Sequence, residues 1–347
     1  MNNLNIINKT LKKKQYTWLI TGVAGFIGSN LLETLLQLNQ KVIGVDNFLT
    51  GSKTNLNYVK KIIKKKQWKN FNFIEGDLCK YDFCKKVCSK KNKIDYVLHQ
   101  AALGSIPRSI KNPLDTHNNN VNAFLNMISA AMNSGVKNFV YASSSSVYGD
   151  SKKIPKIEKI VGNQISSYAL SKYINELYSK VFYKNYRFRS IGLRYFNVFG
   201  KYQNANSSYA AVIPLWINQI LKRENIFING DGKTTRDFCY VDNVVQANLL
   251  AALSKELKIQ NEVFNIAVNS QVSLNQLYLS IKKIVKGFGN NYNLKPIYRD
   301  FRKGDIRHSR ASISKAKKLL LYRPYYNFFD GLKRTIEWHK GIFSKNV

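Results

Sequence analysis

The chain has 347 residues, of which 44% are hydrophobic and 13% aromatic, so it holds enough apolar material for a packed core and lacks the composition of a disordered protein. Its net charge of +35 could indicate a nucleic-acid or membrane surface, but the excess comes from Lys rather than Arg and its Lys runs are scattered. We therefore expect no nucleic-acid partner and no membrane partner. The length favours about two domains.

Residues 1–15 form a basic N-terminal extension. The apolar stretch that follows resembles a signal peptide, but it contains three glycines together with Thr21, Ser29 and Asn30, and no small-residue cleavage pattern follows it. No run of 18 apolar residues predicts a membrane span. The four cysteines form no C-x-x-C pair, so we expect reduced thiols, a cytoplasmic protein and no metal site.

The first half of the chain alternates short β-branched runs with amphipathic stretches. Strands are predicted at 17–21, 41–46, 71–76, 95–100, 138–143 and 190–196. Helices are predicted near 26–38, 53–66, 80–91, 113–134 and 167–185. This rhythm predicts an α/β fold, a Rossmann-like doubly wound parallel sheet whose ligands bind beyond the carboxyl ends of the strands.

After residue 197 the alternation loosens into a helix over 209–223, short strands at 226–229 and 264–268, and a helix that opens with a capping serine at 273. We expect a smaller α/β domain here, built from the two separate segments 197–237 and 269–347. The larger domain then comprises 16–196 together with about 238–268.

A glycine triplet follows the first strand and opens the first helix of the larger domain. Gly22, Gly25 and Gly28 allow a tight turn and a close backbone approach to a pyrophosphate at the helix N-terminus. Asp46 ends the second strand, where an acidic side chain contacts a ribose and repels a 2′-phosphate. These features predict a dinucleotide site that takes NAD rather than NADP.

A tyrosine and a lysine four residues apart share one face of a helix, and a nearby ammonium favours a phenolate. This spacing occurs three times in the chain, but only Tyr168 and Lys172 follow the fifth strand and its serines. Those serines lie in "ASSSSVYG" at 142–149, at the carboxyl end of that strand. Strand alternation groups Ser144 with Ser146 and Ser143 with Ser145, and leaves open which group faces the substrate.

Residues 17–340 resemble the extended short-chain dehydrogenase/reductase superfamily, and within it the UDP-N-acetylglucosamine 4-epimerases of O-antigen and capsule (Vi-type) polysaccharide biosynthesis. The segments that carry the resemblance are "HQAALGSIPRSI", "RYFNVFG", "YAAVIP", "NGDGKTTRDFCYVDN" and "YRDFRKGDIRHS". One departure is Ser143, which stands where the family pattern has Ala. Because Ser and Ala are nearly isosteric, we expect this departure to change little.

The resemblance assigns roles to individual residues. It implies a catalytic Ser144, a base Tyr168 and its partner Lys172. The implied NAD-binding residues are Gly22, Gly25, Phe26, Ile27, Gly28, Asp46, Asn47, Asp77, Leu78, Gln100, Ala101, Ala102, Tyr168 and Lys172. The implied substrate-binding residues are Ser105, Ser144, Ser145, Ser146, Asn197, Arg236, Arg302, Asp305 and Ser309, with the two arginines at the UDP diphosphate.

The function that the resemblance implies is NAD-dependent 4-epimerisation of UDP-N-acetylhexosamines through a 4-keto sugar, supplying surface polysaccharide biosynthesis. The small Ser309 leaves room for a 2-acetamido group, and a homodimer through the helices near 113–134 and 167–185 is expected. Alternatives are a UDP-glucose or UDP-glucuronate 4-epimerase, or a dehydratase, which the neutral Ser145 and Ser146 disfavour. A non-catalytic NAD-binding protein is a further alternative, which the intact Ser144, Tyr168 and Lys172 set disfavours.

Overall fold

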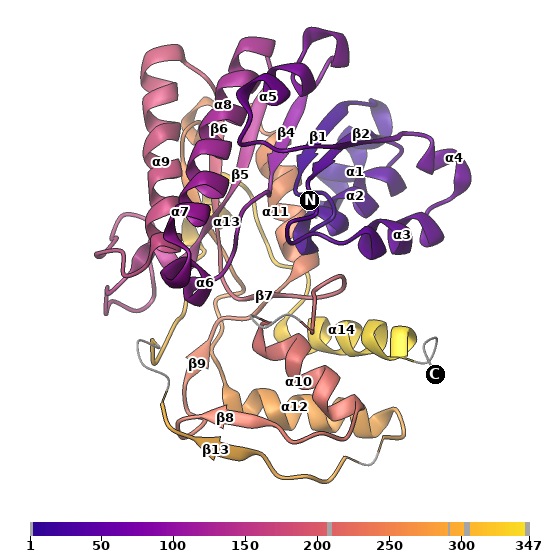
Figure 1. Cartoon of the computed structure of the whole chain (residues 1–347), viewed down its shortest axis with the longest axis vertical. Helices are drawn as coiled ribbons and strands as arrows, with labels where there is room; N and C mark the ends of the chain where they lie inside the picture. The colour runs from indigo at the N-terminus through magenta and orange to yellow at the C-terminus, as the bar shows by residue number, and fades with distance from the viewer. Residues whose placement is uncertain (1–2, 207–209, 291, 302–305, 344–347) are drawn as a thin grey trace.

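A seven-stranded parallel sheet forms the centre of the larger part of this computed structural model, which describes residues 3–206, 210–290, 292–301 and 306–343 (Figure 1). The strand order is β11-β6-β5-β4-β1-β2-β3, and each neighbouring pair is parallel. The strands are β1 (Thr17–Thr21), β2 (Lys41–Asp46), β3 (Phe71–Glu75), β4 (Tyr96–His99), β5 (Asn138–Ser144), β6 (Ser190–Tyr195) and β11 (Val263–Ile266). The Rossmann-like doubly wound fold predicted from the sequence is confirmed.

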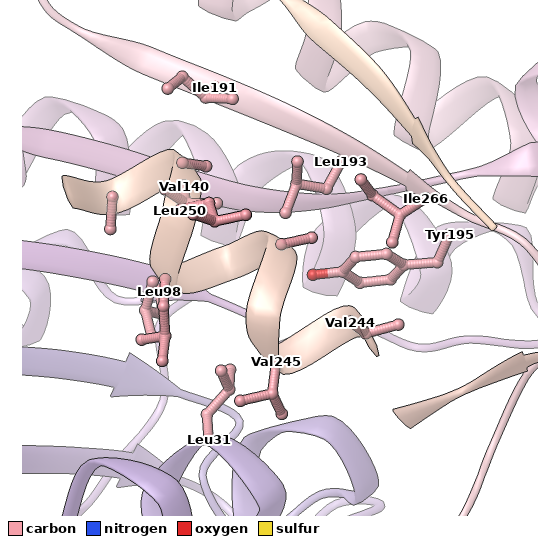
Figure 2. Packing of buried hydrophobic residues seen from close by; sticks show 14 of the residues in the cluster. Leu31, Leu98, Val140, Ile191, Leu193, Tyr195, Val244, Val245, Leu250 and Ile266 are labelled. Carbon is pink, nitrogen blue, oxygen red and sulfur yellow. The ribbon is translucent and has the colours of Figure 1, made fainter. Parts of the chain in front are cut away.

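Helices cover both faces of this sheet because successive strand residues point to opposite sides. The face that carries Trp18 and Ile20 packs against α1 (Asn3–Lys13), α2 (Phe26–Gln37) and α11 (Val241–Leu253). Figure 2 shows α11 lying across this face, with Val244, Val245 and Leu250 near side chains of four strands. The opposite face packs against α5 (Tyr81–Val87), α8 (Ala123–Ser134) and α9 (Ser167–Tyr186).

Several helices are more broken than the sequence predicted. The single helix expected at 53–66 is two, α3 (Lys53–Ile62) and α4 (Lys65–Trp68), and the one expected at 80–91 stops at Val87, before a 3-10 turn, η1 (Lys90–Asn92). The segment 113–134 contains α7 (Pro113–His117), a π-helical turn η2 (Asn118–Asn122) and then α8. A short helix that the sequence did not suggest, α6 (Ile106–Lys111), precedes them.

A second hydrophobic core lies beyond the carboxyl ends of the sheet, among the C-terminal elements at the bottom of Figure 1. Its helices are α10 (Val212–Leu221), α12 (Leu274–Gly287) and α14 (Phe328–Phe343), while α13 (Ser314–Leu319) packs on the first core. Three two-stranded pairs join β7 (Val198–Phe199) to β10 (Cys239–Tyr240), β9 (Thr235–Arg236) to β12 (Val272–Ser273), and β8 (Phe227–Asn229) to β13 (Ile297–Arg299). Two further 3-10 turns are η3 (Ser145–Tyr148) and η4 (Leu257–Ile259). The domain boundaries given above stay a prediction.

The predicted capping serine of the 273–285 helix is present as a complete capping box. The Ser273 side chain accepts from the Gln276 backbone N–H, and the Gln276 side chain accepts from the Ser273 N–H. Each box satisfies two helix-end donors, which explains why α12 starts where the sequence places it.

The basic N-terminal extension folds onto the larger part of the molecule. Ile7 and Leu11 of α1 are each 2% exposed and belong to the core that also contains α11. The buried Gln40 holds the extension in place, because its Nε2 donates to the carbonyls of Leu11 (2.9 Å) and Lys14 (3.3 Å). Its Oε1 accepts from the Tyr16 N–H at 2.9 Å.

None of the helices within the described residues has the length and apolar character needed to cross a membrane. Over the same residues no cluster of His, Cys, Asp and Glu is suited to a metal ion. The four cysteines are all present as free thiols.

Candidate active site

The glycine triplet forms a tight loop between β1 and α2. Gly22 has a φ of 68°, and a Cβ there would lie 2.8 Å from the Ala101 backbone nitrogen. A Cβ on Gly28 would lie 2.1 Å from the Gly22 carbonyl oxygen, so the start of α2 can approach the loop only without a side chain. Gly25 precedes α2 and no side chain caps the helix, an arrangement whose first N–H groups suit an anion such as a pyrophosphate.

Asp46 lies beside this loop at the end of β2. Its carboxylate accepts from the backbone N–H groups of Ala24 (2.9 Å) and Phe48 (2.8 Å), which fix its orientation. Burial raises the pKa of Asp46, and the two backbone N–H groups act in the opposite direction. The loop and the acidic side chain thus occupy the positions that a dinucleotide requires for its pyrophosphate and its ribose.

These groups open into a cavity of about 550 Å³ at the carboxyl ends of the strands, a volume suited to a cofactor-sized ligand. Every residue predicted to bind NAD lines it: Gly22, Gly25, Phe26, Ile27, Gly28, Asp46, Asn47, Asp77, Leu78, Gln100, Ala101, Ala102, Tyr168 and Lys172. The residues present therefore fit the cofactor that the sequence predicted.

Tyr168 and Lys172 lie one turn apart on α9, at the same cavity. Ser144 lines this cavity together with Tyr168, and the Lys172 ammonium donates to the Ala142 carbonyl at 2.9 Å. Burial raises the pKa of Tyr168, and the nearby Ser144 side chain opposes that shift. Burial lowers the pKa of Lys172 to about 8. Both groups are therefore less readily charged here than in water.

The four serines do not form the regular strand alternation that the sequence suggested. β5 ends at Ser144 and a 3-10 turn begins at Ser145, so the two-residue periodicity stops inside the run. All four serines line the cavity, and the Ser144 hydroxyl accepts from the Ser146 N–H at 3.1 Å. The Ser143 hydroxyl donates to Oε1 of the buried Glu176 at 2.6 Å. Ser143 is thus the serine of the run whose hydroxyl is bonded to a buried carboxylate.

A second cavity of about 320 Å³ adjoins the first, because Asn197 and Val198 line both. Asn197 follows β6, and its amide donates to the Asp237 carbonyl at 3.2 Å. Arg236 lines the second cavity and donates to the carbonyls of Thr235 (3.0 Å) and Ile306 (2.6 Å). The predicted substrate residues Asn197 and Arg236 are therefore brought together at a site next to Tyr168.

The other predicted substrate residues are placed differently. Ser105 caps α6 by accepting from the Arg108 N–H at 3.2 Å, and it lines neither of these two cavities. Ser309 also lies outside both, where its N–H donates to the Thr235 carbonyl at 3.2 Å. Arg302 and Asp305 lie outside the described residues.

Two groups of lining residues were missed by sequence reasoning. The first, Leu49, Thr50, Gly51 and Asn55, follows Asp46, and the unusual "FLTGS" after a buried strand was the available signal. The second lines the smaller cavity and consists of Val212, Trp216, Phe227, Asn229, Thr234 and Phe238. These side chains come from α10, β8 and the residues beside β9 and β10, where the sequence pattern indicates only a core, so no sequence signal separated them.

Asn119 was also missed and lies in the first cavity. It belongs to the π-helical turn η2, whose next residue, Asn120, accepts from the Leu103 N–H at 2.7 Å and donates to the Ser171 hydroxyl at 3.0 Å. Such turns occur often at functional sites because they redirect one side chain of a helix. The run of asparagines at 118–120 was the signal.

The chain belongs to the NAD dependent epimerase/dehydratase family, whose model matches residues 18–267. NAD is therefore its cofactor, in agreement with the glycine loop and Asp46.

Three relatives show how far the similarity extends. A putative UDP-glucose 4-epimerase of Methanocaldococcus jannaschii is 34% identical over 93% of this chain and 98% of its own length. The structure of the UDP-glucose 4-epimerase of Thermotoga maritima with UDP-glucose has a TM-score of 0.85 at 33% identity, over 94% of this chain and 99% of that one. The UDP-N-acetylglucosamine 4-epimerase of Methanobrevibacter ruminantium, solved with UDP-N-acetylmuramic acid, also has a TM-score of 0.85, at 35% identity over 95% and 99%.

Proposed function

We propose that this enzyme is an NAD-dependent 4-epimerase of UDP-N-acetylhexosamines that interconverts UDP-N-acetylglucosamine and UDP-N-acetylgalactosamine. One observation carries the proposal. Tyr168, Lys172 and Ser144 line the same cavity as the dinucleotide loop, and a second cavity joins it at Asn197. A sugar at that junction would lie between the cofactor and the tyrosine, with its nucleotide in the second cavity.

The residues of the chain would divide the work at the sugar as follows. Tyr168 takes the proton of the C4 hydroxyl, and Ser144, which lines the same cavity, holds the same oxygen. NAD, when bound, supplies reversible hydride transfer. Because burial disfavours a charged Tyr168, the ammonium of Lys172 is needed nearby to stabilise the phenolate.

The nucleotide half of the substrate would be held at the second cavity. Arg236 suits a diphosphate because a guanidinium donates several hydrogen bonds in a fixed geometry. We propose the same role for Arg302, with Asp305 at the uridine or its ribose and Asn197 at the sugar. Firm anchoring of the diphosphate leaves the sugar free to present either face to the cofactor.

The N-acetylated substrate is supported by the motif segments and by the UDP-N-acetylglucosamine 4-epimerase among the similar structures. The small size of Ser309 gives less support to an N-acetylated substrate than the sequence suggested, because Ser309 lies outside both cavities. UDP-glucose is the second candidate, since two of the three similar proteins carry that name. UDP-glucuronate remains the third.

The test is to incubate the purified protein separately with UDP-N-acetylglucosamine, UDP-glucose and UDP-glucuronate, without added NAD, and to separate the products. We expect UDP-N-acetylglucosamine to be converted with the highest kcat/KM. Faster conversion of UDP-glucose or UDP-glucuronate would assign the activity to that substrate. Bound NAD with no conversion of any of the three would indicate a non-catalytic NAD-binding protein.

We propose in addition a homodimer formed through the helices α7 to α9 in the cytoplasm, where NAD and nucleotide sugars are available. Large apolar side chains are exposed on these helices and on the preceding α6, including Ile110 (66%), Leu114 (78%), Leu170 (47%) and Val181 (48%). Exposed apolar side chains of this size are typical of a surface that pairs with another chain. Light scattering at several concentrations checks it, and a L114K/V181K variant should be monomeric.

A further inference from the structure

Two consecutive residues of β5 are hydrogen-bonded to successive turns of α9. The Ala142 carbonyl accepts from the Lys172 ammonium at 2.9 Å, and the Ser143 hydroxyl donates to Glu176 Oε1 at 2.6 Å. The next residue of β5, Ser144, lines the active-site cavity together with Tyr168 of α9. Because residues four apart share a helix face, Tyr168, Lys172 and Glu176 form one line along α9 that faces the end of β5.

The Glu176 carboxylate is fully engaged in the interior. It is 2% exposed, and it accepts from Arg194 Nε at 2.9 Å and Arg194 Nη2 at 2.7 Å. Arg194, on β6, is 3% exposed and also donates to the Glu158 carbonyl at 3.1 Å. Its guanidinium lies 4.8 Å from the ring centre of Tyr148, which follows the serines. The negative charge of Glu176 is thus balanced by the guanidinium of Arg194 on β6.

Ser143 is the residue through which this buried ion pair is joined to β5. Buried ion pairs are strongly directional because each charged oxygen requires its hydrogen bonds inside a medium of low polarity. A helix anchored at Glu176 can slide or rotate little relative to β5 and β6. The next residue of β5, Ser144, lines the cavity together with Tyr168.

We propose that Ser143 and Glu176 are positioning residues, which fix α9 against β5 so that Tyr168 and Lys172 stay in register with Ser144. The proposal rests on the proposed function, because it concerns the geometry of the groups that act on the sugar. It also corrects the expectation that a serine at position 143 changes little. The hydroxyl that distinguishes Ser143 from an alanine is the one bonded to Glu176.

The experiment compares S143A with S143T, which keeps the hydroxyl, and with S190A as the matched control. Ser190 is 0% exposed, and its hydroxyl lies 2.6 Å from that of Ser179 near the other end of α9. S190A therefore removes an equally buried hydroxyl that contacts the same helix away from Tyr168. For each protein we would measure kcat, KM, bound NAD, and the hydrogen exchange of the backbone amides of residues 169–172.

In S143A we expect kcat to fall about tenfold, with KM and bound NAD unchanged, because a small displacement of a catalytic group is costly. Exchange at 169–172 should be faster than in the wild type. S143T should keep the wild-type kcat and the wild-type exchange at 169–172. S190A should also keep both, although its melting temperature should fall. If S143T fails to fold, the exchange and kcat differences between S143A and S190A decide the matter.

Equal losses of kcat in S143A and S190A would overturn the proposal, since they would reflect general destabilisation. Unchanged exchange at 169–172 in S143A would overturn it as well. An inactive wild-type protein on all three UDP-sugars would instead contradict the proposed function, and the exchange comparison would still test the role of Ser143.

Discussion

The two adjoining cavities are built from different materials. The larger one is lined by glycines and alanines, by the ends of parallel strands and by polar side chains, so that part of its wall is backbone. The smaller one is lined by aromatic and aliphatic side chains on α10 and on strands of two or three residues. The difference indicates that the first cavity has one permitted shape, whereas the second can be altered by exchanging side chains.

Removing the phenol at the junction of the cavities should give the largest effect. We expect Y168F to lower kcat about a thousandfold, because general acid–base catalysis at the C4 oxygen is lost. Bound NAD should stay at the wild-type amount, since the glycine loop is untouched. The measurement is product separation from the preferred UDP-sugar, and near-normal turnover would remove Tyr168 from its role.

Adding a methyl group at Gly28 in the first cavity should have nearly as large an effect, here on stability and on bound NAD. In G28A the new Cβ would lie 2.1 Å from the Gly22 carbonyl oxygen, so backbone must move. We expect a loss of about 3 kcal/mol in unfolding free energy and little bound NAD after purification. G287A is the control, because a Cβ there meets nothing within 4 Å. A G28A protein with full NAD content would contradict a cavity of fixed shape.

Removing the arginine of the second cavity should have a smaller effect, which should appear in KM rather than in bound NAD. We expect R236A to raise KM for the UDP-sugar about thirtyfold, the size of one charged hydrogen bond, with little change in bound NAD. R189A, which removes an exposed arginine, should leave KM unchanged. An effect of R236A on bound NAD as large as its effect on KM would show that the two cavities are not independent.

The smallest expected effect is on the unfolding free energy at acidic pH, to which one histidine of the sheet and one of the C-terminal helices contribute. Burial, with a contribution from Lys172, lowers the pKa of His99 on β4 to about 3, and burial lowers that of His339 on α14 to about 4. The folded forms stay neutral while the unfolded forms gain a proton below pH 6.5, so stability falls as the pH drops from 6.5 toward these values. His99 should cost about 2 kcal/mol at pH 5.

Urea unfolding between pH 7 and 4.5 checks this comparison. The dependence of unfolding free energy on pH should be shallower in H99Q than in the wild type. H339Q should flatten it less, because His339 is partly exposed. Identical pH dependences in all three proteins would show that neither histidine carries the acid sensitivity.

The sheet with its cofactor residues and the second cavity differ in how far the sequence predicts them, and the reason is physical. The strands of the sheet and the cofactor residues were predictable, because parallel strands are continuous apolar runs and a phosphate loop requires glycines at fixed spacing. The lining of the second cavity was not, since residues such as Trp216 and Phe227 look the same whether they fill a core or border a cleft.

The serine run shows the limit most clearly. The position of the run at the carboxyl end of the fifth strand predicted its place at the cavity, but the strand alternation that grouped the serines in pairs ends at Ser145, where a 3-10 turn begins. The orientation of Ser143 depends on Glu176, 33 residues later, and on its partner Arg194. A pairing across such a distance leaves no local pattern in the sequence.

The order in which the sheet is completed has a consequence for biosynthesis. The edge strand β11 and the helix α11, which covers part of one face together with α1 and α2, are encoded after residue 240, whereas the strands they pair with or cover end at residue 195. While the ribosome extends the chain between those points, β6 is an unpaired edge beside an apolar face that α11 does not yet cover. Nascent chains of this length should therefore be the ones that chaperones hold, and release should follow once residue 266 has emerged.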